Sequence, residues 1–226
     1  METKLADFKR EGRSPIIGVI GATFPTMPYK KHMGMKVGYV LRSYVEREEG
    51  SIFTGGVEGV GVDVYTGVTR FCIDEGIRRG ELLEDGFFVL IPENIEVGSK
   101  ETYRTMKYNP PDSYEALAQL SRRRELDIVR AGANMNERRE KVAEVADVII
   151  TVNGGMGTLD EAVNALKLSK RVITLPYTGG AARVLDKLRN PIGRRIRLAS
   201  CGFGDVNVDF DLIIPASSSE EMLAHL

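Results

Sequence analysis

The feature that most constrains this chain is a series of short, almost uninterrupted apolar runs separated by segments of helical periodicity. Apolar runs of this length are typical of strands buried on both faces, as in parallel sheets. A weaker seventh run, Asp127 to Ala131, follows the same pattern. The six clear runs predicted to be strands are Ile16 to Gly21, Ser51 to Thr54, Phe87 to Pro92, Asp147 to Val152, Arg171 to Pro176 and Asp211 to Pro215.

Apolar residues between the runs recur at helical spacing, and each set marks one sheet-facing side of a helix. The order is therefore βαβα, which predicts an α/β fold with a doubly wound, mostly parallel, Rossmann-like sheet and helices on both faces. We expect residues 1–226 to form a single nucleotide-binding domain, with 1–15 as a candidate flexible segment. The two clearest sets are Val64, Val68, Phe71 and Cys72, and Leu159, Ala162, Val163 and Leu166.

Composition excludes several functional classes. With 31 Lys+Arg against 32 Asp+Glu, the formal net charge is -1, so no global field favours nucleic acid or an anionic membrane as a partner. No apolar run approaches the roughly 20 residues that span a bilayer, and the first residues contain no apolar signal segment. We therefore expect a cytoplasmic protein in which any bound anion is held by local groups.

Cysteine and histidine are scarce. Cys72 and Cys201 form no CxxC pair, which favours a reducing compartment. His32 and His225 lie near opposite ends of the chain, which argues against a Ser-His-Asp triad or a zinc site. We expect no metal and no cofactor.

Three predicted strand ends are followed by glycine-rich turns: Gly21-Ala22-Thr23, Gly55 to Gly61, and Asn153 to Thr158. In open α/β sheets, ligands bind beyond the carboxyl ends of the strands, so all three turns are expected at one edge. Glycine permits close backbone approach, and free amides at the following helix start suit a phosphate. Each turn alone is equally compatible with tight packing, but three together favour a shared anion-binding crevice.

None of these turns has the GxGxxG pattern of classical dinucleotide binding or the GxxxxGK[ST] pattern of P-loop hydrolases. A nicotinamide oxidoreductase is therefore the minority interpretation. A decarboxylase that uses pyridoxal phosphate is weaker still, because no fingerprint assigns the lysine that it needs.

Two charged side chains are predicted to start helices at the same edge. Arg138 lies four residues before Val142, whose helix face is expected to meet the sheet, while Thr158 and Glu161 share one side of the next helix. A carboxylate and a guanidinium would then converge on whatever the glycines hold. The alternative is that both are ordinary helix charges placed in solvent or near a helix dipole.

One long irregular stretch, Glu93 to Asp112, contains Tyr103 and Tyr108, and a helix is expected around Ser113 to Arg124. Loops this long inside compact domains are lids, binding loops or disordered segments. If it is a lid, either tyrosine is a candidate to stack on a nucleobase.

The segments NMNERREKV (Asn134 to Val142) and NGGMGTLDE (Asn153 to Glu161) resemble, in order and spacing, the MHERK and PGGxGTxxE signatures of the Lonely Guy family. Proteins of that family are often mislabelled lysine decarboxylases. The turn from Thr54 to Val68 is similar to the family's GGGxxGLMG segment. This chain departs from the signatures at three positions, with Asn153 for the proline, Asn136 for the histidine and Arg139 for the lysine.

The resemblance implies a Rossmann-like homodimer, or higher oligomer, that hydrolyses the N-glycosidic bond of a nucleoside 5′-monophosphate to base and ribose 5-phosphate. Matched by position, the family's catalytic arginine and glutamate fall on Arg138 and Glu161. Predicted nucleotide- or phosphate-binding residues are Gly21, Ala22, Thr23, Gly55, Gly56, Arg139, Gly154, Gly155, Gly157 and Thr158.

This chemistry suits the residues. Cleaving a ribosyl C–N bond develops positive charge on the sugar, which the Glu161 carboxylate would stabilise, or it would orient the attacking water. Arg138 is too weak an acid to donate a proton and would instead hold the substrate in position. The alternative function is a nucleotide or cofactor carrier, or a sensor, with the same fold and no hydrolysis.

Overall fold

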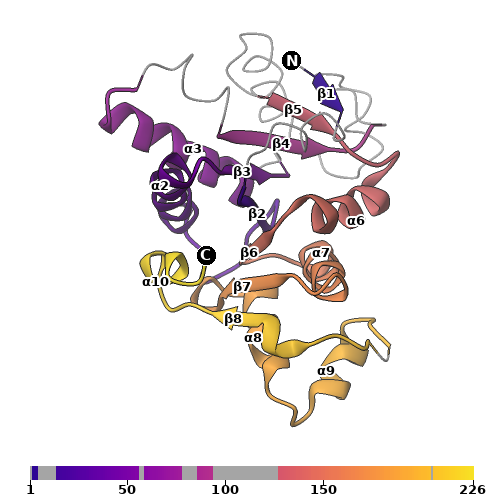
Figure 1. Ribbon diagram of the computed structural model, residues 1–226. Coiled ribbons are helices and arrows are strands. Elements are labelled where there is room, and N and C mark those ends of the chain that lie inside the picture. Colours follow the sequence, from indigo (N-terminus) through magenta and orange to yellow (C-terminus); the bar gives the residue numbers. More distant parts are fainter. Residues whose placement is uncertain (1, 5–13, 56–58, 78–85, 94–126, 205) are drawn as a thin grey trace.

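The computed structural model describes residues 2–4, 14–55, 59–77, 86–93, 127–204 and 206–226. These residues form one eight-stranded sheet, in the order β1-β5-β4-β3-β2-β6-β7-β8, and every neighbouring pair is parallel (Figure 1). The predicted α/β fold with a doubly wound parallel sheet is confirmed. The strands are β1 (Glu2–Lys4), β2 (Ile16–Gly21), β3 (Ser51–Thr54), β4 (Phe87–Ile91), β5 (Asp127–Arg130), β6 (Val148–Val152), β7 (Arg171–Leu175) and β8 (Ile213–Pro215).

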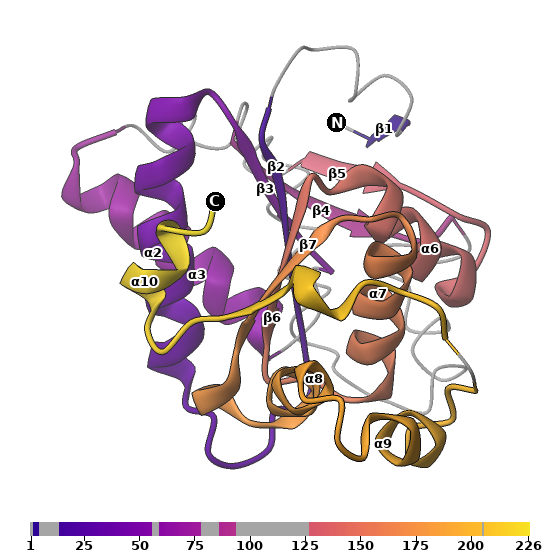
Figure 2. The same cartoon turned by 60° about the horizontal axis from the view of Figure 1, so that its bottom comes forward.

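Both faces of the sheet are covered, which explains the uninterrupted apolar runs. Ile17 and Val19 of β2 pack into one hydrophobic layer, and their neighbours Ile16 and Ile20 pack into the other, as the two-residue period of a strand requires. Figure 2 shows helices on either side of the strands. The first layer is closed by α2 (Lys31–Glu48), α3 (Val60–Asp74) and α10 (Ser219–Leu223), and the second by α6 (Met135–Val145), α7 (Met156–Lys167), α8 (Gly180–Arg189) and α9 (Arg194–Ser200).

Strand ends differ from the predicted runs for identifiable reasons. Asp147 precedes β6 rather than starting it, and its carboxylate accepts a hydrogen bond of 2.8 Å from the backbone of Ile16. Asp211 lies in a short 3₁₀ turn, η3 (Phe210–Leu212), before β8. A second such turn, η2 (Pro176–Thr178), follows β7. β1 was not predicted, because its three residues contain no apolar run.

Helices α2 and α3 cross at very short range. A Cβ atom at Gly38 would lie 2.0 Å from the carbonyl oxygen of Val64, and one at Gly67 would lie 1.8 Å from that of Met35. Neither position has room for a side chain, so these two glycines set the spacing of the helix pair. In the described part of the chain, no helix is long and apolar enough to cross a membrane.

The order of the strands places a switch point at the centre of the sheet. From β2 the chain adds β3, β4 and β5 on one side, then returns to add β6, β7 and β8 on the other. The turns after β2 and β6 therefore diverge toward opposite halves. In open α/β sheets this divergence leaves the crevice in which ligands bind.

Candidate functional site

A cavity of about 380 Å³ lies at this switch point, beyond the carboxyl ends of β2, β3 and β6. Its size falls in the range of about 300–1,000 Å³ found for small-molecule sites. The three glycine-rich turns meet here, as predicted. Gly56 lies outside the described residues; the other predicted site residues all line the cavity: Gly21, Ala22, Thr23, Gly55, Arg138, Arg139, Gly154, Gly155, Gly157, Thr158 and Glu161.

The turn after β2 owes its first glycine to close packing. A Cβ atom at Gly21 would lie 2.5 Å from the carbonyl oxygen of Val152, so any side chain would push β2 away from β6. The next residue fixes the start of α3, because the backbone carbonyl of Ala22 accepts a hydrogen bond of 3.1 Å from the amide of Val60. This wall of the cavity is therefore set by backbone contacts.

The turn after β6 presents the beginning of α7 to the cavity. Gly154 has a φ of 101°, a conformation that glycine adopts without strain, and Gly155 is the N-cap. Because glycine has no side chain that could cap the helix, the first amides of α7 depend on another partner. Together with the helix dipole, they form an arrangement suited to a phosphate.

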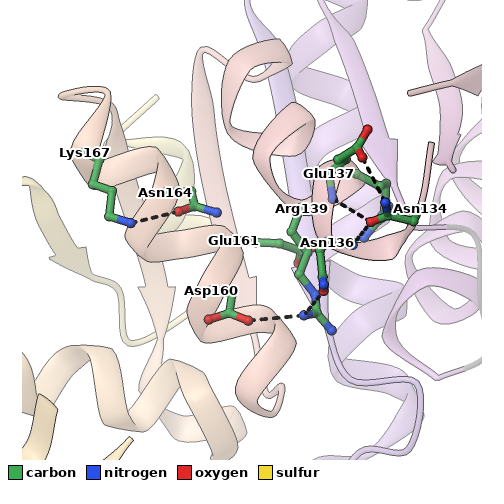
Figure 3. A network of polar contacts seen from close by, with 9 residues as sticks. Asn134, Asn136, Glu137, Arg139, Asp160, Glu161, Asn164 and Lys167 are labelled. Carbon is green, nitrogen blue, oxygen red and sulfur yellow. Dashed lines mark hydrogen bonds and ion pairs between the residues drawn. The ribbon is translucent and has the colours of Figure 1, made fainter. Parts of the chain in front are cut away.

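The two neighbouring helix starts are already occupied. The Asn134 side chain accepts hydrogen bonds from the amides of Asn136 and Glu137, and the Glu137 carboxylate returns to accept from Ala133 and from Asn134 (Figure 3). These contacts cap α6. The first amides of α8 are occupied by backbone carbonyls of the turn after β6.

The start of helix α8 holds the Asn153-Gly154 turn in place through two backbone hydrogen bonds. The amide of Ala181 donates to the carbonyl of Gly154 at 2.9 Å, and that of Ala182 donates to the carbonyl of Asn153 at 3.0 Å. The Gly179-Gly180 segment therefore forms a helix start that packs on the turn, and neither glycine is among the cavity-lining residues. Of these three helix starts, that of α7 remains for an anion.

Arg138 and Glu161 form a buried ion pair that joins α6 to α7. The Nη1 atom of Arg138 donates to Oε1 of Glu161, and its Nε atom donates to the carbonyl of Leu90 at 2.9 Å. The two residues are 5% and 6% exposed, respectively. A Cβ atom at Gly55 would lie 2.6 Å from the Nη2 atom of Arg138, so this glycine makes room for the guanidinium.

Burial has the largest effect on the pKa of the Glu161 carboxyl group. Removal of Glu161 from water raises its pKa above the ordinary value, while the positive charges of Arg138 and Arg139 act in the opposite direction. A carboxylate with a raised pKa is a better proton acceptor near neutral pH than an ordinary one. Its side chain lines the cavity, so it is placed to act on a bound molecule.

Arg139 lies at the more open side of the site. Its Nη1 atom is 3.2 Å from Oδ2 of Asp160 and 3.3 Å from Oδ1 of Asn136 (Figure 3). A Cβ atom at Gly157 would lie 3.1 Å from its Nη2 atom, so the guanidinium sits directly against the first turn of α7. This second cation adds to the positive potential at the predicted phosphate position.

Asn153 is a structural residue that the sequence analysis did not include in the site. It is fully buried, has a φ of 54°, and its side chain accepts from the amide of Thr26 while donating to the carbonyls of Thr26 and Thr178. Asparagine tolerates this left-handed backbone, whereas proline is fixed near −65°. The departure from PGGxGT at this position thus matches a local conformation that excludes proline.

Other cavity residues were also missed. Phe24, Thr26 and Met135 line it, together with Val19 and Ile20 of β2, whereas Gly61, which also lines it, belongs to a turn that was predicted at this edge. Their position in the sequence could have identified Phe24 and Thr26, because both lie in the segment TFPTMP, shortly after the end of a predicted strand. Tyr103 and Tyr108, the predicted lid aromatics, and the helix expected around Ser113 to Arg124 lie outside the described residues.

Comparison with known families agrees with the signature segments. A family model described as "possible lysine decarboxylase" matches residues 93–176, a span that contains both Arg138 and Glu161. The predicted resemblance to the Lonely Guy family, whose proteins often carry that label, is confirmed. No curated protein sequence matches this chain closely enough to count as a relative.

Solved structures share the fold at low sequence identity. The X-ray structure of the structural-genomics target TM1055 is 19% identical, with a TM-score of 0.58 over 93% of this chain and 96% of that one. The molybdenum cofactor binding protein of Rippkaea orientalis is 21% identical (TM-score 0.54, coverage 95% and 96%). The molybdenum cofactor carrier protein of Chlamydomonas reinhardtii is 18% identical (TM-score 0.55, coverage 94% and 96%).

Proposed function

We propose that this chain, whose residues 93–176 match the possible lysine decarboxylase family, hydrolyses the N-glycosidic bond of a nucleoside 5′-monophosphate. The products are the free base and ribose 5-phosphate. One observation carries the proposal. The buried Arg138–Glu161 pair and the phosphate-suited start of α7 line the same cavity, so an anion and a reacting sugar can be held side by side.

Each end of the substrate has a physical counterpart in the cavity. The 5′-phosphate binds at Gly155, Gly157 and Thr158, where the amides of α7 meet the guanidinium of Arg139. The ribose then lies toward Glu161. Holding the phosphate fixes the distance between the sugar and the carboxylate, which is how remote binding energy accelerates a reaction.

In the reaction, the bond between C1′ and the base nitrogen breaks, and its electron pair goes to the base. A water oxygen forms the new bond to C1′. The Glu161 carboxylate stabilises the positive charge that develops on the sugar and accepts the proton from water, which ends on the released base. Arg138 remains charged throughout and keeps the carboxylate oriented through the buried ion pair.

A carrier or sensor of the same fold is the second candidate. The observation that favours it is the ion pair itself, since the Glu161 carboxylate already has a cationic partner. Such a carboxylate contributes to ligand affinity without having to accept a proton. In that case the same cavity would bind a phosphorylated ligand and release it unchanged.

A panel of nucleoside 5′-monophosphates incubated with the purified chain separates the two functions. Hydrolysis predicts that free base and ribose 5-phosphate are released in equal amounts, which chromatography measures. The Glu161→Gln variant should release neither product. Glu144→Gln is the matched control, because it removes a carboxylate from the surface of α6, where it pairs with Lys141. Tight binding without base release across the panel would replace the hydrolase with the carrier or sensor.

A further inference from the structure

The edge of the cavity carries an aromatic side chain in an unusual position. Phe24 lines the cavity, yet 52% of its surface is exposed. Among the described residues around this cavity it is the aromatic one, and charged residues, Arg138, Arg139 and Glu161, line the same cavity. A phenyl ring held partly in water at the rim of a polar site offers a flat apolar face to a ligand.

The turn that carries Phe24 is fixed on both sides of the ring. On one side, a Cβ atom at Gly59 would lie 2.9 Å from Cδ of Pro25, so the start of α3 packs against this proline. On the other side, the buried Asn153 side chain binds both the amide and the carbonyl of Thr26, at 3.2 and 3.1 Å. The position of Phe24 is therefore set by contacts of its two neighbours with the start of α3 and with the turn after β6.

A further anchor follows the turn. The amide of Tyr29 donates to the carbonyl of Thr26 at 3.1 Å, and its hydroxyl donates to Oδ2 of Asp63 on α3 at 2.8 Å. The segment from Ala22 to Tyr29 is thus attached to α3 and to the β6 turn. A ring carried on such a segment loses little conformational entropy when a ligand stacks on it, which favours binding.

We infer that Phe24 is the residue on which the base of the substrate stacks. This inference rests on the proposed function and identifies the part of the cavity that recognises the base. The phosphate binds at α7 and the ribose near Glu161, which leaves the base toward the turn after β2. Stacking on an aromatic ring accepts any base and favours the larger purines, so Phe24 sets affinity for the base as a class.

The test compares ligands with and without a base. Dissociation constants of adenosine 5′-monophosphate and of ribose 5-phosphate are measured by titration calorimetry in a Glu161→Gln background, which prevents turnover. Phe24→Leu keeps apolar bulk but removes the ring, and should weaken the nucleotide by about tenfold or more, within the range for loss of one base stack. Ribose 5-phosphate binding should change by less than about twofold, because it does not reach the ring.

Two further variants complete the design. Phe24→Tyr retains the ring and should restore nucleotide affinity to within about twofold of the unaltered residue. Met27→Ala is the matched control, because Met27 lies in the same turn, is 81% exposed and is not among the cavity-lining residues. It should leave both dissociation constants unchanged.

The outcomes distinguish this inference from the proposed function. Equal losses for both ligands in Phe24→Leu, or no binding of the nucleotide to the unaltered cavity, would overturn the stacking role. A selective loss of nucleotide affinity would support it even if the enzyme with Glu161 intact released no base. That combination of results would contradict the proposed hydrolysis, but Phe24 would still be the base contact of a nucleotide-binding protein.

Discussion

Arg138 and Glu161 lie 23 positions apart in the chain and on different helices, yet they form one buried ion pair beneath the cavity. The guanidinium is held in turn by the carbonyl of Leu90 on β4. Helix α6, helix α7 and the sheet therefore share a single charged contact. Because the pair is desolvated, loss of either partner leaves a charge without compensation.

Replacing Glu161 with glutamine should remove turnover while binding changes little. The amide keeps the shape of the side chain and can still accept from Arg138, but it cannot stabilise the cationic ribosyl transition state. We expect kcat to fall by roughly two or more orders of magnitude with a modest change in KM. Steady-state kinetics of base release measures both, and an unchanged kcat would remove Glu161 from the chemistry.

Replacing Arg138 with alanine should affect stability, binding and turnover together. The change leaves the Glu161 carboxylate buried without its partner, which costs on the order of 3–5 kcal/mol of unfolding free energy in comparable pairs. Urea unfolding measures this loss of unfolding free energy. Arg138→Lys keeps the charge but cannot donate to both Leu90 and Glu161 from a planar group, so it should recover only part of the activity.

Replacing Gly155 with leucine should abolish ligand binding without unfolding the chain. A Cβ atom at this position meets nothing within 4 Å, and the residue lines the cavity, so the new side chain would occupy ligand space. Gly204→Leu is the control, because that glycine is equally open and is not among the cavity-lining residues. Retained affinity for a nucleoside monophosphate in calorimetry would remove the α7 start as the phosphate site.

The raised pKa of Glu161 predicts opposite effects of pH on activity and stability. Only the ionised carboxylate accepts a proton, so kcat/KM should fall as pH drops through a value above the ordinary 4.5. The folded chain binds this proton more tightly than the unfolded chain does. Its contribution to stability is therefore full below about 4.5 and is lost as pH rises through the folded-state value.

A pH–rate profile tests the first effect, and urea unfolding across the same range tests the second. In Glu161→Gln, the corresponding part of the pH dependence of stability should disappear, because the amide does not titrate. An acid limb of the rate profile at or below the ordinary carboxyl value would contradict the assignment.

Replacing Gly38 with alanine should destabilise the fold without a direct effect on the cavity. The added methyl group would approach the Val64 carbonyl to 2.0 Å, so α2 and α3 must separate. Overpacking of this kind costs about 1–3 kcal/mol. Gly204→Ala serves as the control in denaturant unfolding, and an unchanged midpoint for Gly38→Ala would show that the helix pair adjusts freely.

Much of the fold follows from local sequence. The runs at β2, β3 and β6 are short and buried on both faces, which is typical of strands inside a parallel sheet. The convergence of the glycine turns followed from parallel topology alone. Arg138 and Glu161 became candidates through their positions at helix starts on the same edge, and the spacing of two short signature segments assigned their roles, because nothing local to either residue specifies its partner.

Other parts of the site depend on tertiary contacts that no window of sequence contains. Asn153 takes a left-handed backbone because Thr26 and Thr178 satisfy its side chain, and these lie 127 and 25 residues away. The exposure of Phe24 depends on where that contact fixes its turn. Edge strand β1 lacks an apolar pattern, and it is recognised only through its pairing with β5.

The position of the cavity between β2 and β6 also bears on how this chain folds. Its two walls come from segments more than a hundred positions apart, as the contact between Thr26 and Asn153 at a separation of 127 illustrates. Pairings of such high contact order carry a large loop-closure entropy and are slow to form. A ligand that bridges both walls binds only after this pairing is complete, so it shifts the folding equilibrium by mass action. The rate at which binding competence appears during refolding should therefore follow the central β2–β6 pairing and lag behind the formation of the local helices.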